Sequence, residues 1–175
     1  MPAPLPLGVL PLVLVLALPP PPAPASKTCS LLTSADIEAA TGEKPDGEGH
    51  PSEMQPPGSN EPMQMCTWVV RNQKGQVMIS TAHMPPGTDA KALAKNNPGM
   101  DALRAQKWTE ESKDFGNAWC AVMSPPASAK PPMYMSACAA APKGMVLSVT
   151  YISPTKKLSI DQTKALTDKA AARVP

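Results

Sequence analysis

Aromatic side chains and histidines are scarce in this chain of 175 residues, which has one Phe, three Trp, two Tyr and two His. Its core must therefore be built mainly from Val, Leu, Ile, Met and Ala. A serine or cysteine nucleophile usually needs a histidine base oriented by a third group, and neither His50 nor His83 stands in such a pattern. The sequence therefore predicts a protein that is not an enzyme and has no cofactor. An exported hydrolase is kept as an alternative.

A concentrated excess of positive charge is also absent. The chain has 16 Lys and Arg against 14 Asp and Glu, which gives a net charge of +2. Surfaces that bind nucleic acids normally carry a clustered basic face, so we expect no nucleic-acid partner. The adjacent Glu110 and Glu111 would point to opposite sides of a strand, which indicates solvated charge rather than a catalytic carboxylate pair.

No charged residue precedes Lys27, and this uncharged beginning contains an apolar run over residues 6–18. The run is shorter than the roughly 20 apolar residues of a membrane-spanning helix. Four prolines follow it, and an Ala-Pro-Ala sequence ending at Ala25 matches the small residues that a signal peptidase accepts. We interpret residues 1–25 as a signal peptide, although the usual basic beginning is missing. A retained hydrophobic anchor is the alternative.

Cleavage after Ala25 would leave residues 26–175 as a single extracytoplasmic domain, periplasmic or secreted. Cys29 lies where a lipidated cysteine would stand, but the charged Lys27 just before it does not fit a lipidation site. We therefore expect no stable membrane anchor after cleavage.

Closely spaced cysteine pairs, which zinc sites need, are absent as well. The four cysteines are Cys29, Cys66, Cys120 and Cys138. An even number of cysteines in an exported domain predicts two disulfides. Residues 118–123 and 133–138 are typical of strands, and the proline-rich turn between them sets Cys120 opposite Cys138, within disulfide reach. We therefore favour Cys120–Cys138 and, by elimination, Cys29–Cys66.

The rest of the chain shows further strand and helix patterns. Three more strands are expected over residues 63–70, 76–84 and 145–152. Helices are expected over residues 34–42, from Thr88 with a restart at Asn97-Pro98, and over 159–173. Residues 43–62 are rich in Pro and Gly and are expected to form a long exposed loop.

This order of elements predicts the α+β fold class. We expect an antiparallel sheet of about five strands, with the N- and C-terminal helices packed on one face and the disulfides stapling the structure.

The motifs together resemble those of small secreted bacterial domains. They are the Cys-Ser-Leu-Leu-Thr run at Cys29, Cys66 followed by Trp68, the strand entry at residues 116–119 and the closing helix. The chain resembles the actinobacterial DUF3558-type secreted lipoproteins and, more loosely, the extracellular sensor domain of a mycobacterial Ser/Thr kinase. The resemblance implies an extracytoplasmic α+β domain that binds an unidentified ligand. It carries no catalytic residue across.

Methionine is the abundant residue in this composition, with 11 in the chain. Residues two apart on a strand project from the same face, so the pairs Met63/Met65 and Met133/Met135 would each present two thioethers. Thioethers are ligands that Cu(I) prefers. The hairpin register also sets Met123 opposite Met135, and His83 would add an imidazole. The candidate ligands are therefore Met63, Met65, Met123, Met133, Met135 and His83. The alternative is that the methionines bind no metal and fill a core that is poor in aromatic side chains.

The sequence favours a non-enzymatic binding or structural module of the cell envelope or the secreted fraction. Its partner would be an envelope protein or a small ligand, contacted by the loop 43–62 and by the sheet face that helices leave uncovered. A periplasmic Cu(I)- or Ag(I)-binding protein is the first alternative.

Overall fold

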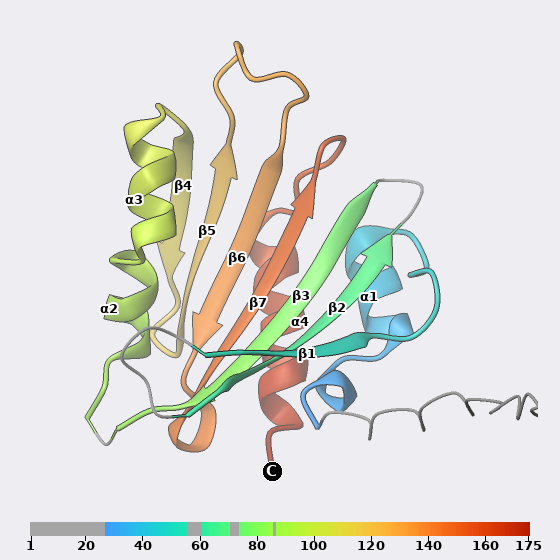
Figure 1. The fold of residues 1–175 in the computed structure, drawn as a ribbon, viewed down its shortest axis with the longest axis vertical. Helices are drawn as coiled ribbons and strands as arrows, with labels where there is room; N and C mark the ends of the chain where they lie inside the picture. The colour runs from blue at the N-terminus through green and yellow to red at the C-terminus, as the bar shows by residue number, and fades with distance from the viewer. Residues whose placement is uncertain (1–26, 56–60, 71–73, 86) are drawn as a thin grey trace, which may run out of the picture.

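The computed structural model describes residues 27–55, 61–70, 74–85 and 87–175. The predicted signal peptide, residues 1–25, lies outside these ranges, as do residues 56–60 of the predicted loop. Seven strands form one antiparallel sheet in the order β1-β2-β3-β7-β6-β5-β4 (Figure 1). The strands are β1 (His50–Met54), β2 (Met63–Val70), β3 (Gly75–His83), β4 (Thr109–Asp114), β5 (Ala118–Ser124), β6 (Tyr134–Ala140) and β7 (Met145–Ser153). The α+β class is confirmed, but the expectation of about five strands is wrong.

The two additional strands are the two edges of the sheet. β1 lies inside residues 43–62, so the prediction of one long loop over that segment is also wrong. All five residues of β1 are exposed, and five of the six residues of β4 are exposed. An edge strand pairs on one side only and is commonly polar, because charge there discourages pairing with other molecules. Such a strand has no alternation of apolar and polar residues, so the sequence does not predict it.

Gly49 allows the chain to enter β1 close to the core. A Cβ atom at this position would lie 2.4 Å from Sγ of Cys66 and 2.6 Å from Cε2 of Trp68. Both of those side chains are buried on β2. Only glycine therefore lets the backbone pass this closely over the first disulfide.

Helices α1 (Ser34–Thr41) and α4 (Ile160–Ala172) pack on one face of the sheet, behind it in Figure 1. Each begins with a capping box, formed by Thr33 with Asp36 and by Ser159 with Gln162, which satisfies backbone N–H groups that the first helical turn leaves free. The main core lies between these helices and the sheet. Its largest fully buried members include Ile37, Ile79, Leu147, Tyr151, Leu158 and Leu166.

Helices α2 (Ala90–Lys95) and α3 (Pro98–Ala105) lie on the opposite face. Asn97 caps α3 and Pro98 occupies its first position, as the sequence predicts. A second, smaller core forms where Met100 of α3 packs with Trp119 and Met123 of β5. α2 and α3 stand over the β5–β6 half of this face, and no helix of the described ranges covers the β3–β7 half beside them (Figure 1).

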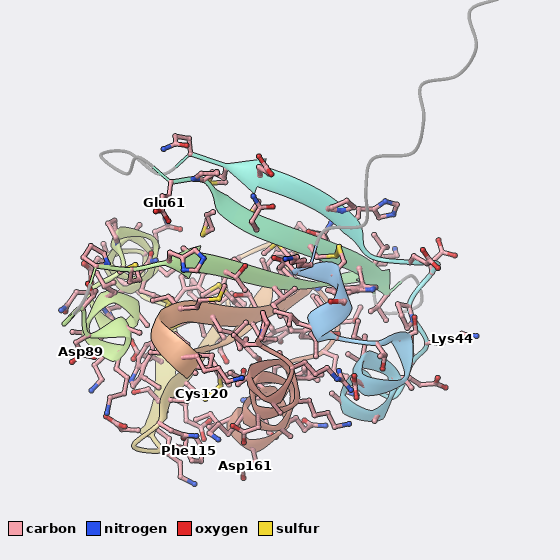
Figure 2. The ribbon with its side chains drawn as sticks, turned by 90° about the horizontal axis from the view of Figure 1, so that it is seen from below. Lys44, Glu61, Asp89, Phe115, Cys120 and Asp161 are labelled. Atoms are coloured by element: carbon pink, nitrogen blue, oxygen red, sulfur yellow. A yellow bond between two sulfur atoms is a disulfide. The ribbon has the colours of Figure 1, made fainter. Side chains whose placement is uncertain are left out.

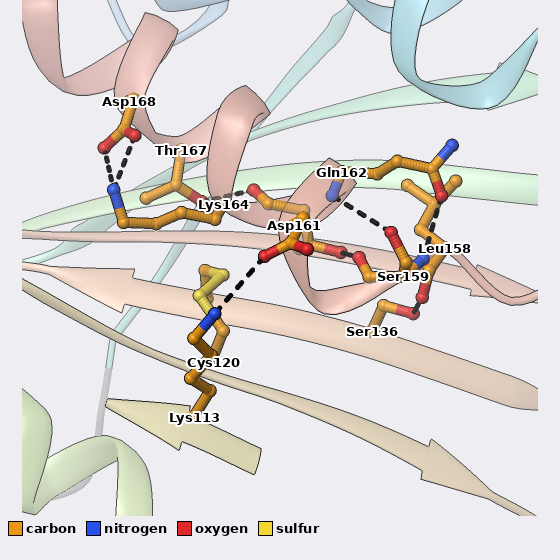
Figure 3. The surroundings of a disulfide bond; sticks show 12 residues. Lys113, Cys120, Ser136, Leu158, Ser159, Asp161, Gln162, Lys164, Thr167 and Asp168 are labelled. Atoms are coloured by element: carbon orange, nitrogen blue, oxygen red, sulfur yellow. Dashed lines mark hydrogen bonds and ion pairs between the residues drawn. A yellow bond between two sulfur atoms is a disulfide. The ribbon is translucent and has the colours of Figure 1, made fainter. Parts of the chain in front are cut away.

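The structure contains two disulfides, in the pairing favoured above. Cys29, in a short 3-10 helix (Cys29–Leu31), bonds to Cys66 on β2. Cys120 and Cys138 are direct partners on β5 and β6 and also bond to each other. Figure 3 shows the second disulfide beneath α4, beside the ion pair of Lys113 with Asp161. Two disulfides are typical of an oxidising compartment.

None of the helices in the described ranges has the length and the hydropathy needed to cross a bilayer.

Asp36 joins the beginning of α1 to the end of α4. Its carboxylate accepts hydrogen bonds from Arg173 at 2.5 Å and from the backbone N–H of Thr33 at 2.9 Å, and it is paired with Lys169 at 3.1 Å. Burial alone would raise the pKa of Asp36. The hydrogen bonds from Arg173, Thr33 and Lys169 outweigh burial and hold that pKa well below its usual range.

Replacing Asp36 with asparagine is expected to lower the free energy of unfolding by about 1–3 kcal/mol at neutral pH, because a cap and charge-assisted hydrogen bonds are lost. The unfolded chain binds this proton near pH 4, above the folded pKa, so the stabilisation is present above about pH 4 and is lost as the pH falls further. Urea unfolding of both proteins from about pH 7 to about pH 2 should show the difference shrinking.

The control is Asp168→Asn, which removes a half-exposed partner of Lys164 and should cost less than about 0.5 kcal/mol. If the loss of unfolding free energy in Asp36→Asn stays constant down to about pH 2, the ionised Asp36 carboxylate does not stabilise the fold as described.

Candidate functional site: an apolar groove

The uncovered half of the sheet and the two helices beside it enclose an apolar groove of about 480 Å³. Its floor is formed by strands β3, β7 and β6, and α2 and α3 form one wall. Figure 2 shows Glu61, just before β2, and Asp89, just before α2, on the same side of the molecule. The first residues of these two elements, Met63 and Ala90, both line the groove. Met63 lines the β2 end, and Trp119 lines the β5 end.

The strand registers explain why the floor is hollow. One row of directly paired residues runs across the sheet through Met65, Ser80, Ser148, Ala139 and Trp119. The large side chains stand at the two ends of this row, and the three between them are small. In the next row, Met78 on β3 pairs with Thr150, Thr150 pairs with Ala137 and Ala137 pairs with Ala121. Small side chains on β7 and β6 therefore leave the space that larger ones would fill.

The groove is elongated across the strands. From β2 to β5 it crosses four strand spacings, which amounts to about 19 Å at the usual separation of neighbouring strands. The lining at the β5 end is closed, because Met100 and Trp119 are both buried. At the β2 end Met63 and Ser80 are only half-buried. The opening therefore lies toward β2 and the closed end toward β5.

The helical wall presents small and apolar side chains. Ala90, Leu93 and Ala94 of α2 and Leu103 of α3 line the groove. Leu93 is 48% exposed, one of the two large apolar side chains in the described residues that are clearly solvent-exposed. Leu93 therefore extends the apolar lining of the groove to its solvent-exposed rim.

Ion pairs to the edge strand hold α2 and α3 in place. Lys91 and Lys95 both bind the Asp114 carboxylate on β4, at 3.2 and 3.3 Å, and Arg104 binds Glu110 at 2.7 Å. The backbone N–H of Gly116, followed by the two lysines, lowers the pKa of Asp114. These charges lie behind the wall and not in the groove.

Polarity changes along the groove. No charged side chain is among its described lining residues. The hydroxyls of Ser80, Ser148 and Thr150 lie on β3 and β7, whereas the β5 end is formed mainly by the apolar surfaces of Trp119 and Met100, with the Asn97 amide at the start of α3. The site therefore suits a ligand that is mostly apolar and has its polar group toward the open end.

The predicted metal-binding methionines do not gather at one place. Met63 and Met135 both line the groove, but β3 and β7 separate their strands, a distance of about 14 Å across the sheet. Met65 lies beside Met63 on β2, and Met123 is buried opposite Met135.

Two further candidates differ from the expected placement. Met133 precedes β6, so the expectation that Met133 and Met135 share one strand is wrong. His83 ends β3 in an exposed position, and strand alternation places it on the face opposite to Met78 and Ser80. Within the described ranges, no three His, Cys, Asp or Glu residues could hold a metal ion together. Cu(I) binding stays a prediction.

The sequence pattern missed the groove although part of its signal was present. In β7, the buried Leu147, Val149 and Tyr151 alternate with Val146, Ser148 and Thr150, which indicates one polar, uncovered face. In β6, Ala137 and Ala139 alternate with Cys138 and Ala140. The positions of α2 and α3 had no such signal, because short helices can pack on either face of a sheet.

Comparisons of this chain with protein families, with curated proteins and with solved structures give no match. The resemblance to the DUF3558-type proteins therefore stays a prediction.

Proposed function

We propose that this protein is a non-enzymatic binding protein of the periplasm or the secreted fraction, and that a small apolar ligand occupies the groove between α2–α3 and the open half of the sheet. The observation that carries the proposal is the floor of small side chains between Met65 and Trp119, beside an uncharged helical wall. The groove volume of about 480 Å³ lies within the range of small-molecule sites.

The chemistry of the lining supports binding rather than catalysis. Ser80 and Ser148 supply hydroxyls, but no histidine, carboxylate or lysine lines the described groove to activate them. Cys138, which also borders the groove, is held in a disulfide. Such a site can desolvate and orient a ligand, and it has no group placed to transfer a proton.

The disulfides and the signal peptide predicted from the sequence support the proposed compartment. Paired cysteines persist where the surroundings are oxidising, as in the periplasm or outside the cell. A protein there would meet apolar molecules that are poorly soluble in water, and burying their surface is the main favourable contribution that this groove offers.

Methionine methyl groups provide a direct test, because Met63, Met100 and Met135 line the groove. The protein is labelled with ¹³C at its methionine methyls and titrated with N-phenyl-1-naphthylamine, an uncharged apolar probe. These three resonances should shift on addition of the probe. Met145, which packs against the core on the other face, should not shift.

Assignments come from single Met→Leu variants, which conserve volume in most cores. Shifts that spare the three groove methionines, or no binding of the probe, would show that the groove is not an apolar binding site.

A further inference from the structure

We propose that the ligand of this groove is a single unbranched acyl chain, with its carboxyl end over the hydroxyls of β3 and β7 and its methyl end against Trp119. This inference rests on the proposed function and narrows it to one class of ligand.

The capacity of the groove fits one chain and not two. A protein cavity of about 150 Å³ accepts benzene, so by proportion the 480 Å³ of this groove has room for roughly 19 carbon atoms. A fatty acid of about 16 to 18 carbons fits within that limit. A phospholipid with two such chains exceeds it about twofold.

The shape of the groove favours a long, narrow occupant. The floor runs across four strand spacings from β2 to β5, about 19 Å, and on β7 its lining reaches from Val146 to Thr150, about 14 Å along the strand. A rounded ligand would leave the two ends of such a trough unfilled. A flexible chain can follow it from the open end to the closed one.

The polar groups of the lining argue against a peptide. A buried peptide brings an N–H and a C=O at each residue, and each of these needs a partner. Among the described lining residues, the polar side-chain groups are mainly the hydroxyls of β3 and β7 and the Asn97 amide, and the Asn97 amide oxygen already accepts a hydrogen bond from the N–H of Gly99 at 2.8 Å. An acyl chain carries no polar group between its ends, so it leaves none without a partner.

The same polar groups orient the chain. Ser80 and Ser148 are direct cross-strand partners on β3 and β7, three and two strand spacings from β5, and their hydroxyls can donate to a carboxylate. The end at Met100 and Trp119 is formed mainly by apolar surface, and both residues are buried. The methyl end therefore lies within contact of the Trp119 ring, which makes that tryptophan a reporter of binding.

The experiment titrates the purified, disulfide-bonded protein with monomeric saturated fatty acids of about 8 to about 20 carbons, and follows tryptophan fluorescence. The dissociation constant should fall about fourfold for each added methylene and level off near roughly 18 carbons, where the groove is full. An acid with bromine at its methyl end should quench more strongly than one of equal length with bromine beside the carboxyl group.

The site of quenching is tested by two matched variants. Trp119→Phe should remove most of the difference between the two brominated acids. Trp68→Phe, which changes a buried tryptophan on the opposite face of the sheet, should keep that difference.

The outcomes separate this inference from the proposed function. Binding of N-phenyl-1-naphthylamine without binding of the acids, or with acid binding that does not depend on chain length, would contradict the acyl-chain inference. That result would still support an apolar binding site in the groove. If neither the probe nor the acids bind, both proposals are wrong. Binding to phosphatidylcholine vesicles without binding of monomeric acid would overturn the single-chain assignment.

Discussion

Replacing both Cys29 and Cys66 with alanine is expected to lower the free energy of unfolding by about 4 kcal/mol. The bond closes a loop across 37 positions of the sequence, and constraining a loop of that length removes much conformational freedom from the unfolded chain. The same bond ties the N-terminal helical region to β2, beneath Gly49 and the edge strand. The midpoint of urea unfolding and the dependence of the unfolding free energy on urea concentration should be measured for the double variant and for the unmodified protein.

The matched control removes the other disulfide. The Cys120–Cys138 bond spans only 18 positions, so its loss is expected to cost less, about 3 kcal/mol. It also joins strands that their backbone ladder already holds in register. A larger loss for this pair than for the Cys29–Cys66 pair would contradict the account of how the two bonds stabilise the fold.

Buried elements of the fold were predictable because burial leaves a pattern in the sequence. The five inner strands carry apolar side chains, and both capping boxes stand where polar residues precede an apolar helix face. The Cys120–Cys138 pairing followed from a hairpin folded symmetrically about its turn. Each of these features is local, or connects segments that are neighbours along the chain.

The edge strands were not predictable for the opposite reason. β1 contains Pro51 and no buried residue, and β4 is strongly charged, so neither has an apolar period. Their pairing depends on the neighbouring strand rather than on their own sequence. Gly49 is required before β1, since a side chain there would meet Cys66.

The candidate site was predictable only as a general location. An uncovered sheet face was expected, and the small residues of β6 and β7 were visible in the sequence. The groove also needs α2 and α3 on that face, where Lys91 and Arg104 join them to β4. Because β4 itself lacks a strand pattern, the anchor points of the helical wall could not be inferred.

The central claim is that the groove, and not another surface, holds an apolar ligand. Ser148 lies half-buried at the middle of the floor, between Ser80 and Ala139. Ser148→Phe would place a ring in the space that the ligand occupies, while adding little strain because that space is open. Gln76→Phe adds the same ring at an exposed position of β3. Gln76 lies on the same face of the sheet as Ser80 and Ser148 but outside the groove lining.

Fluorescence titration of the folded variants with N-phenyl-1-naphthylamine is therefore the most direct measurement. The dissociation constant of Ser148→Phe should rise at least about 100-fold, equivalent to about 2.7 kcal/mol of binding free energy. That of Gln76→Phe should stay within about twofold of the unmodified protein. Unchanged binding by Ser148→Phe, or an equal loss in both variants, would contradict the assignment of the groove as the binding site.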